Sequence, residues 1–153
     1  MNVKHITPFM EALIKILEQH GISGIKRGAV VKKDVMTVDQ DITSVIGING
    51  GIRGNIAYSL SDKTAIRLLT AMKLTVPAQL FGPEARYAVG AMTEMIISKA
   101  SELILEEGII IYATPPTIVF GEEIHFNISP VQTIAVNIET PCGTVEINIG
   151  LEE

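Results

Sequence analysis

Three stretches of the chain repeat apolar residues at the three- and four-residue spacing of an amphipathic helix. The first begins at Thr7-Pro8, which reads as a cap followed by a proline at the first helical position, and it runs to Gly21. Ser61 caps the second stretch, and Pro83 begins the third, which is the longest. The pattern predicts three helices, with Pro77 closing the connection between the second and the third.

Other segments are rich in β-branched residues and are bounded by turn residues, as strands are. The segments 42–48 and 52–60 flank Asn49-Gly50-Gly51, whose residues tolerate the positive φ of a tight hairpin turn. The segments 132–140 and 144–151 flank a Pro-Cys-Gly turn in the same way. Four shorter strands are expected around 30–38, 109–112, 117–120 and 124–128.

The order of helix, short strand and hairpin occurs twice, so the chain is expected to contain an internal pseudo-repeat. Strands that come as hairpins and helices that come as separate blocks predict an α+β fold. We expect two layers, a mainly antiparallel sheet with long helices on one face. With 153 residues and 47% hydrophobic side chains, residues 1–153 are expected to form a single domain.

Charge and hydropathy exclude several classes of partner. The net charge is −5, and the twelve basic residues form no cluster, so neither nucleic acid nor an anionic membrane is an expected partner. The N-terminus lacks the apolar core of a signal peptide, and apolar stretches are interrupted well before the roughly 20 residues of a membrane span. A cytoplasmic protein is therefore expected.

Common catalytic and metal-binding motifs are missing from the sequence. The glycines from Gly47 to Gly54 join two predicted strands, whereas a dinucleotide-binding loop would have to open a helix. His5, His20 and His125 lie far apart and lack metal-ligand spacing. Cys142 is the single cysteine, and a small turn residue is a better interpretation of it than a nucleophile.

The third predicted helix has two different faces. Its core stripe contains eight residues at about 100° per residue, namely Ala85, Ala88, Val89, Met92, Met95, Ile96, Ala100 and Leu103. The opposite face carries Tyr87, Ala91, Glu94, Ser98 and Ser101. These five residues are the candidate partner-binding surface.

Three segments, taken in order, resemble the CheX branch of the CheC/CheX family. They are 45–59, then Ala88-Val-Gly90 with Met95-Ile96, then 114–121. The resemblance implies a CheC-like fold and an enzyme that removes the aspartyl phosphate of the response regulator CheY. It also implies a helical Glu-x-x-Asn pair, in which the carboxylate engages a lysine of the regulator and the amide orients a water. The Mg²⁺ of that reaction belongs to the regulator, so no cofactor is expected in this chain.

The positions that match the catalytic pair hold Ala91 and Glu94. Alanine cannot pair with an ammonium group, and a carboxylate accepts hydrogen bonds but donates none and repels a phosphoryl group. Shifting the register by three residues would put Glu94 in place of the acid, but Ile97 would then replace the amide. The expectation is a protein that binds a phosphorylated CheY-type receiver domain and is catalytically degenerate.

Two alternatives stay open. In the first, the protein is an active phosphatase with altered geometry, in which Glu94 works with Thr93 or Ser98. In the second, the face of small residues packs against another copy of the chain. The resemblance also implies a homodimer through strands that extend the sheet, and the polar-flanked strand around Val30 to Val38 is a suitable edge.

Overall fold

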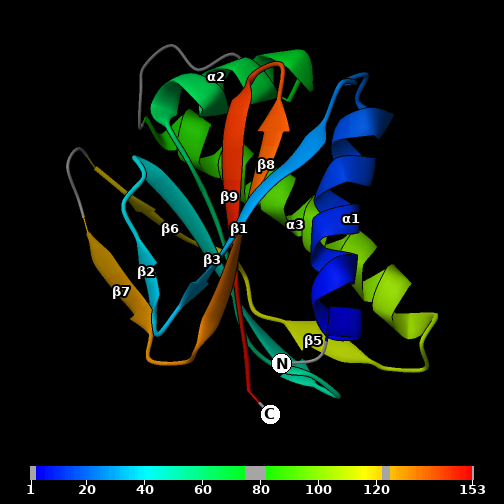
Figure 1. Cartoon of the computed structure of the whole chain (residues 1–153). Helices are drawn as coiled ribbons and strands as arrows, with labels where there is room; N and C mark the ends of the chain where they lie inside the picture. The colour runs from blue at the N-terminus through cyan, green and yellow to red at the C-terminus, as the bar shows by residue number, and fades with distance from the viewer. Residues whose placement is uncertain (1–2, 75–81, 122–124, 153) are drawn as a thin grey trace.

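The computed structural model describes residues 3–74, 82–121 and 125–152 (Figure 1). Pro77 and Ile124, the first residue of the strand expected at 124–128, lie outside these ranges. Within them the elements follow in the order α1 (Val3–Gln19), β1 (Lys26–Lys33), β2 (Met36–Val38), β3 (Ile42–Gly50), β4 (Arg53–Leu60), α2 (Asp62–Ala71), α3 (Pro83–Leu105), β5 (Ile111–Ala113), β6 (Thr117–Phe120), β7 (Phe126–Ser129), β8 (Thr133–Thr140) and β9 (Gly143–Glu152).

One seven-stranded antiparallel sheet forms the centre of the molecule, in the order β1-β8-β9-β4-β3-β5, with β6 also pairing with β3. Both predicted hairpins are present, as β3–β4 and β8–β9. Gly50 has φ +106°, and a Cβ there would lie 2.6 Å from the Ile110 carbonyl oxygen. The first turn therefore requires glycine at this position, both for its φ and for the close approach of β5.

The internal repeat is visible in the strand pairings. The first four strands correspond in order to the last four: β1 to β6, β2 to β7, β3 to β8 and β4 to β9. Under this correspondence the β1–β8 pair becomes β6–β3, and the β3–β4 pair becomes β8–β9. The pairs β2–β7 and β4–β9 map onto themselves. Because α1 and α3 begin the two halves and contact each other, the molecule has a pseudo-two-fold arrangement.

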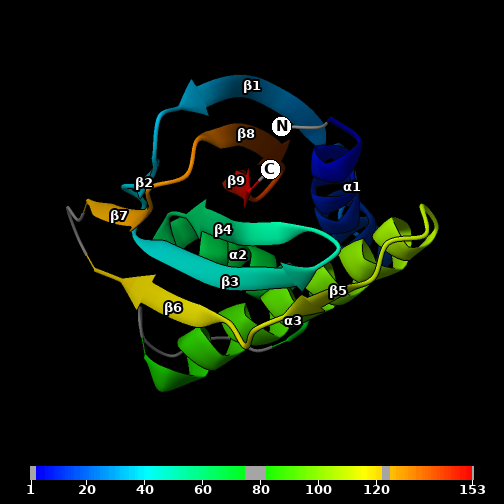
Figure 2. The same ribbon diagram turned by 90° about the horizontal axis from the view of Figure 1, so that it is seen from below.

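Helices α1 and α3 cover one face of the sheet, and α2 lies at the end near the β8–β9 turn (Figures 1 and 2). The core between helices and sheet contains fully buried side chains from both layers, among them Phe9, Leu13, Met92, Ile96, Ile56 and Ile147. The α+β class, the antiparallel sheet and the helices on one face are thus confirmed. No helix in the described ranges is long and apolar enough to cross a membrane.

Two local predictions are wrong. The first helix begins at Val3, so Pro8 lies inside it and does not start it. Burial of Ile6 continues the apolar stripe ahead of Pro8 and stabilises the extra turn, although proline removes one helical hydrogen bond. Thr7 does not cap the helix, because its hydroxyl donates to the Val3 carbonyl oxygen at 3.1 Å.

The single strand expected around 30–38 is in fact two strands in two sheets. The longer one, β1, pairs with β8, whereas β2 pairs with β7 in a separate two-stranded ribbon. This ribbon lies on the face of the sheet opposite the helices (Figure 2). It buries Met36 and Val38 against Ala57 of β4 and adds a small layer that the sequence pattern did not predict.

Candidate functional site

Packing against the sheet fixes the rotation of α3 about its own axis. Val89, Met92 and Ile96 are buried on the side that faces the core. The fully buried Thr93 hydroxyl lies 2.8 Å from both the Val89 carbonyl oxygen and the Ser44 hydroxyl of β3. These contacts connect α3 to the sheet and turn positions 91 and 94 outward. Thr93 itself is inaccessible, so its proposed part in an altered catalytic site is wrong.

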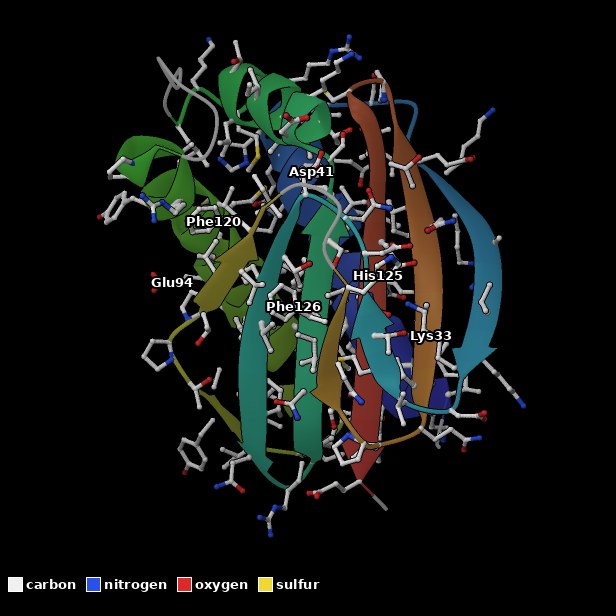
Figure 3. The ribbon with its side chains drawn as sticks, turned by 90° about the vertical axis from the view of Figure 1, so that its left-hand side faces the viewer. Lys33, Asp41, Glu94, Phe120, His125 and Phe126 are labelled. Atoms are coloured by element: carbon white, nitrogen blue, oxygen red, sulfur yellow. The ribbon has the colours of Figure 1, made fainter. Side chains whose placement is uncertain are left out.

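The outer side of α3 carries the five residues expected there. Tyr87 is 82% exposed, and Glu94 and Ser98 are also exposed, whereas Ala91 and Ser101 are half-buried. The Ser101 hydroxyl donates to the Ile97 carbonyl oxygen at 2.9 Å, so it is already engaged within the helix. Glu94 projects away from the sheet beside β6 (Figure 3).

A groove runs between this side of α3 and the connection from β5 to β6. It consists of two adjoining hollows of about 410 and 350 Å³, and both are lined by Glu94 and Pro115. The larger is also lined by Arg86, Tyr87, Gly90, Ala91, Pro116 and Ile118, and the smaller by Ile46, Ile97, Ser98, Ser101, Ala113 and Thr114. Glu94 therefore stands where the two hollows meet.

The far wall of the groove is held rigidly against β3. The Thr114 amide donates to the Gly47 carbonyl oxygen at 2.9 Å, and the Gly47 amide donates to the Thr114 hydroxyl at 2.8 Å. Pro115 and Pro116 follow and interrupt the strand, because proline has no N–H for a ladder bond. The segment 114–121 was identified from the sequence as part of a family likeness, but its position opposite Ala91 and Glu94 was not predicted.

The charged groups of the groove have few partners. Glu94 forms no ion pair or side-chain hydrogen bond with any described residue. The Arg86 guanidinium lies 4.5 Å from the centre of the Phe120 ring, and its Nε is buried without a hydrogen-bond partner in the part of the chain that the structure describes. Arg86 was missed in the sequence, although Arg86, Gly90 and Glu94 follow one another at four-residue intervals along one row of the helix.

This arrangement limits the chemistry of the site. Ala91 offers no polar atom, and the Glu94 carboxylate accepts hydrogen bonds but donates none. Ser98 lies one helical turn from Glu94 and is the exposed hydroxyl beside it. No group of His, Cys, Asp or Glu within the described ranges could hold a metal ion. The groove can bind a cation at Glu94, but positions 91 and 94 cannot orient a water through an amide.

Other candidates from the sequence lie away from the groove. Cys142 occupies the β8–β9 turn, where its amide donates to the Thr140 hydroxyl at 3.0 Å, in agreement with a turn residue. His20 Nδ1 lies 2.8 Å from the Ile16 carbonyl oxygen at the end of α1. The glycines from Gly47 to Gly54 belong to the β3–β4 hairpin and open no helix.

Comparisons of sequence identify a family and a relative. A family model described as chemotaxis phosphatase CheX matches residues 42–139. CheY-P phosphatase CheX from Thermotoga maritima is 31% identical over 87 residues, which are 57% of this chain and 56% of that protein. The match thus spans little more than half the length of this curated relative.

Solved structures share the fold over nearly the whole chain. A CheC-like superfamily protein from Shewanella sp. PV-4 is 24% identical, with a TM-score of 0.87 and all of both chains covered. The CheX–CheY–BeF3–Mg²⁺ complex from Borrelia burgdorferi gives 18% identity and a TM-score of 0.78, with 99% of this chain and 100% of that chain covered. At these identities the likeness shows a common fold.

Proposed function

Because this chain belongs to the CheX family of chemotaxis phosphatases, we propose that it docks on a CheY-type receiver domain, the phosphorylated form included, without hydrolysing the aspartyl phosphate. The groove beside α3 is the proposed docking site. Its exposed residues Tyr87, Glu94 and Ser98 would meet the receiver, and the small Ala91 would allow close approach.

The observation that carries this proposal is the pair Ala91 and Glu94 on the outer side of α3. Phosphoryl transfer to water depends on positioning and charge stabilisation more than on covalent chemistry, so the loss of two positioning groups removes most of what the protein could contribute. A carboxylate at position 94 adds repulsion of the phosphoryl group. Binding does not require the two lost groups, because Glu94 can still pair with a lysine of the receiver.

Isothermal titration calorimetry against purified receiver domains from the same genome tests the docking. Each receiver is titrated untreated and after beryllofluoride activation, which stands in for the phosphoryl group. Saturable binding of at least one receiver is the expected result. Heats of dilution alone for every receiver in both states would contradict the proposal.

A second function, an active phosphatase with altered geometry, is favoured by one observation. Glu94 is exposed in the groove and has no ion-pair partner among the described residues, and Ser98 offers a hydroxyl one turn away. Loss of phosphate from a labelled receiver, followed with and without this protein in molar excess, separates the two functions. Acceleration would support the phosphatase, whereas an unchanged rate would support docking without hydrolysis.

The remaining proposals concern assembly and surroundings. We propose a cytoplasmic homodimer in which β1, the edge strand of the sheet, contributes to the interface. Both Val30 and Val31 of β1 are more than half exposed although they point to opposite faces of the sheet, which supports this choice of edge.

The Mg²⁺ of the phosphorylated complex is proposed to be bound by the receiver and not by this chain.

A further inference from the structure

Arg86, Gly90 and Glu94 form a row on α3 in which a glycine separates a cation from an anion. The two charged residues are eight positions apart, about 12 Å along the axis at 1.5 Å per residue. Outside its own helix, a Cβ on Gly90 would find one neighbour within 4 Å among the described residues, the Pro116 Cγ at 3.8 Å. Gly90 therefore keeps the larger hollow open between Arg86 and Glu94.

Arg86 is held in place but is left with an unused donor. Its guanidinium stacks on the Phe120 ring at 4.5 Å, which fixes its direction, and it has no ion-pair partner among the residues that the structure describes. The buried Nε has no acceptor there either. A buried donor without an acceptor is costly, and a guanidinium binds a carboxylate through two parallel N–H groups. Because Nε is buried while the Arg86 side chain is half-buried and lines the larger hollow, a carboxylate in that hollow would meet the terminal NH2 groups.

We propose that Arg86 binds a surface carboxylate of the docked receiver while Glu94 binds one of its lysines. This inference rests on the proposed function and names the chemistry of the partner: an acid and an ammonium group that face opposite ends of the hollow. Arg86 is then a residue that determines specificity, and it takes no part in phosphate chemistry.

The charge of the hollow favours a carboxylate over a phosphoryl group as the anion. Arg86 and Glu94 together contribute no net charge to its lining. A phosphoryl group carries a charge of about −1.5 to −2, which one guanidinium beside a carboxylate cannot neutralise, whereas a partner's acid and lysine match the two ends. The contribution of Arg86 to affinity is therefore expected to be independent of phosphorylation.

The test measures calorimetric affinity for a bound receiver, untreated and with beryllofluoride, using Arg86→Gln and Arg86→Lys. Arg67→Gln, which changes an exposed arginine of α2, is the matched control. Loss of a charged hydrogen-bonded pair is expected to weaken binding about tenfold or more for Arg86→Gln, by a similar factor in both states. Arg86→Lys keeps the charge but loses the fork and should recover part of the affinity, while Arg67→Gln should bind like the unmodified protein.

Thermal unfolding of the same variants distinguishes recognition from a structural role. Affinity unchanged in Arg86→Gln would overturn the proposal, as would a loss confined to the beryllofluoride state, which would assign Arg86 to the phosphoryl group. The proposal would also be overturned if Arg86→Lys unfolded at a lower temperature than the unmodified protein but bound the receiver with the same affinity. The role of Arg86 would then be structural.

A separate measurement decides the role of Arg86 if no receiver binds, in which case the proposed function fails. The Nε–H signal of Arg86 is followed by NMR as sodium acetate replaces sodium chloride at constant ionic strength. A shift of this signal beyond that of Arg67 would support a carboxylate site at Arg86. Equal small shifts of the two arginines would reject it.

Discussion

At the scale of single residues, a tyrosine in the core has a hydroxyl that its described surroundings do not satisfy. Tyr58 of β4 is fully buried, and its hydroxyl has no hydrogen-bond partner in the described part of the chain. Burial raises the pKa of Tyr58 far above its usual value of 10.0, because the apolar surroundings disfavour the phenolate. The hydroxyl therefore contributes little to stability at neutral pH, and at alkaline pH it lowers the free energy of unfolding.

Replacing Tyr58 with phenylalanine is expected to leave the free energy of unfolding at pH 7 unchanged or to raise it by up to about 1 kcal/mol, because an orphaned hydroxyl is removed. The unfolded chain ionises this tyrosine above about pH 10 while the folded chain does not, so folding stability falls as pH rises past that value. Between pH 8 and pH 11, the free energy of unfolding should fall by about 1.4 kcal/mol more in the unmodified protein than in Tyr58→Phe. Urea unfolding at both pH values measures the difference.

The control for this prediction is Tyr87→Phe, since the Tyr87 side chain is 82% exposed. The fall in its free energy of unfolding from pH 8 to pH 11 should match that of the unmodified protein. Equal losses in Tyr58→Phe and the unmodified protein would show that the Tyr58 phenol is not protected from ionisation in the folded state.

Residue roles could be predicted from the sequence where they depend on one helix, and not where they depend on a neighbouring element. Helical periodicity was sufficient to put Ala91 and Glu94 on the outer side of α3. The stacking of Arg86 on Phe120 joins α3 to β6, and no local pattern indicates such a contact. The burial of Thr93 was missed because a hydroxyl residue is expected at the surface of a helix. Only the structure shows that the Ser44 hydroxyl accepts its hydrogen bond in the core.

At the scale of elements, the width of the groove depends on how closely α3 approaches the connection between β5 and β6. Gly90 is the smallest residue on the helix side of the larger hollow, and Pro116 lies opposite. A glycine inside a helix costs about 1 kcal/mol relative to alanine. The open hollow is a structural reason to have glycine at this position.

Two substitutions at Gly90 separate its effects on stability and on binding. Gly90→Ala is expected to raise the free energy of unfolding by up to about 1 kcal/mol, because alanine is the better helix former and the added Cβ meets only ordinary contact with Pro116. Gly90→Leu should fill the hollow and weaken binding of a receiver domain by about tenfold or more while the protein stays folded. Urea unfolding and calorimetry measure the two effects. Unweakened binding by Gly90→Leu would mean that no partner group enters the larger hollow.

Hairpins and long helices were predictable because their signals are local. The Asn-Gly-Gly turn, the Ser61 cap and Pro83 each mark an element end with the residues beside it, and the structure has element ends at those places. The β2–β7 ribbon was not predictable, because three- and four-residue strands carry little periodicity and pair across more than half of the sequence. The extra turn of α1 ahead of Pro8 was missed for a similar reason: tertiary burial of Ile6 outweighed a local stop signal.

At the scale of the whole molecule, the pseudo-two-fold arrangement leaves its two halves with different edges. The edge that continues from β8 is the long strand β1, whereas β5 and β6 share the edge beside β3 and form one wall of the groove. Four cations lie on β1: Lys26, Arg27, Lys32 and Lys33. Two copies of β1 paired antiparallel along their full length would bring Lys26 against Lys33 and Arg27 against Lys32 of the second copy.

Dimerisation through β1 is therefore expected to strengthen with salt, because like charges opposite one another are destabilising and salt screens them. Sedimentation equilibrium at 50 and 500 mM NaCl should show a smaller dissociation constant at the higher concentration. Lys32→Glu, which places opposite charges across the interface, should strengthen the dimer at low salt, while Lys63→Glu on α2 should not. A dimer that weakens with salt, or that responds equally to both variants, would place the interface elsewhere.

We propose that this member of a phosphatase family has kept its docking groove and lost its chemistry. The most direct measurement is the rate of phosphate loss from a bound, labelled receiver, with the unmodified protein and with Ala91→Glu/Glu94→Asn compared in equal molar excess. We expect no acceleration by the unmodified protein and a clear acceleration by the double variant. Acceleration by the unmodified protein that the double variant does not exceed would contradict it.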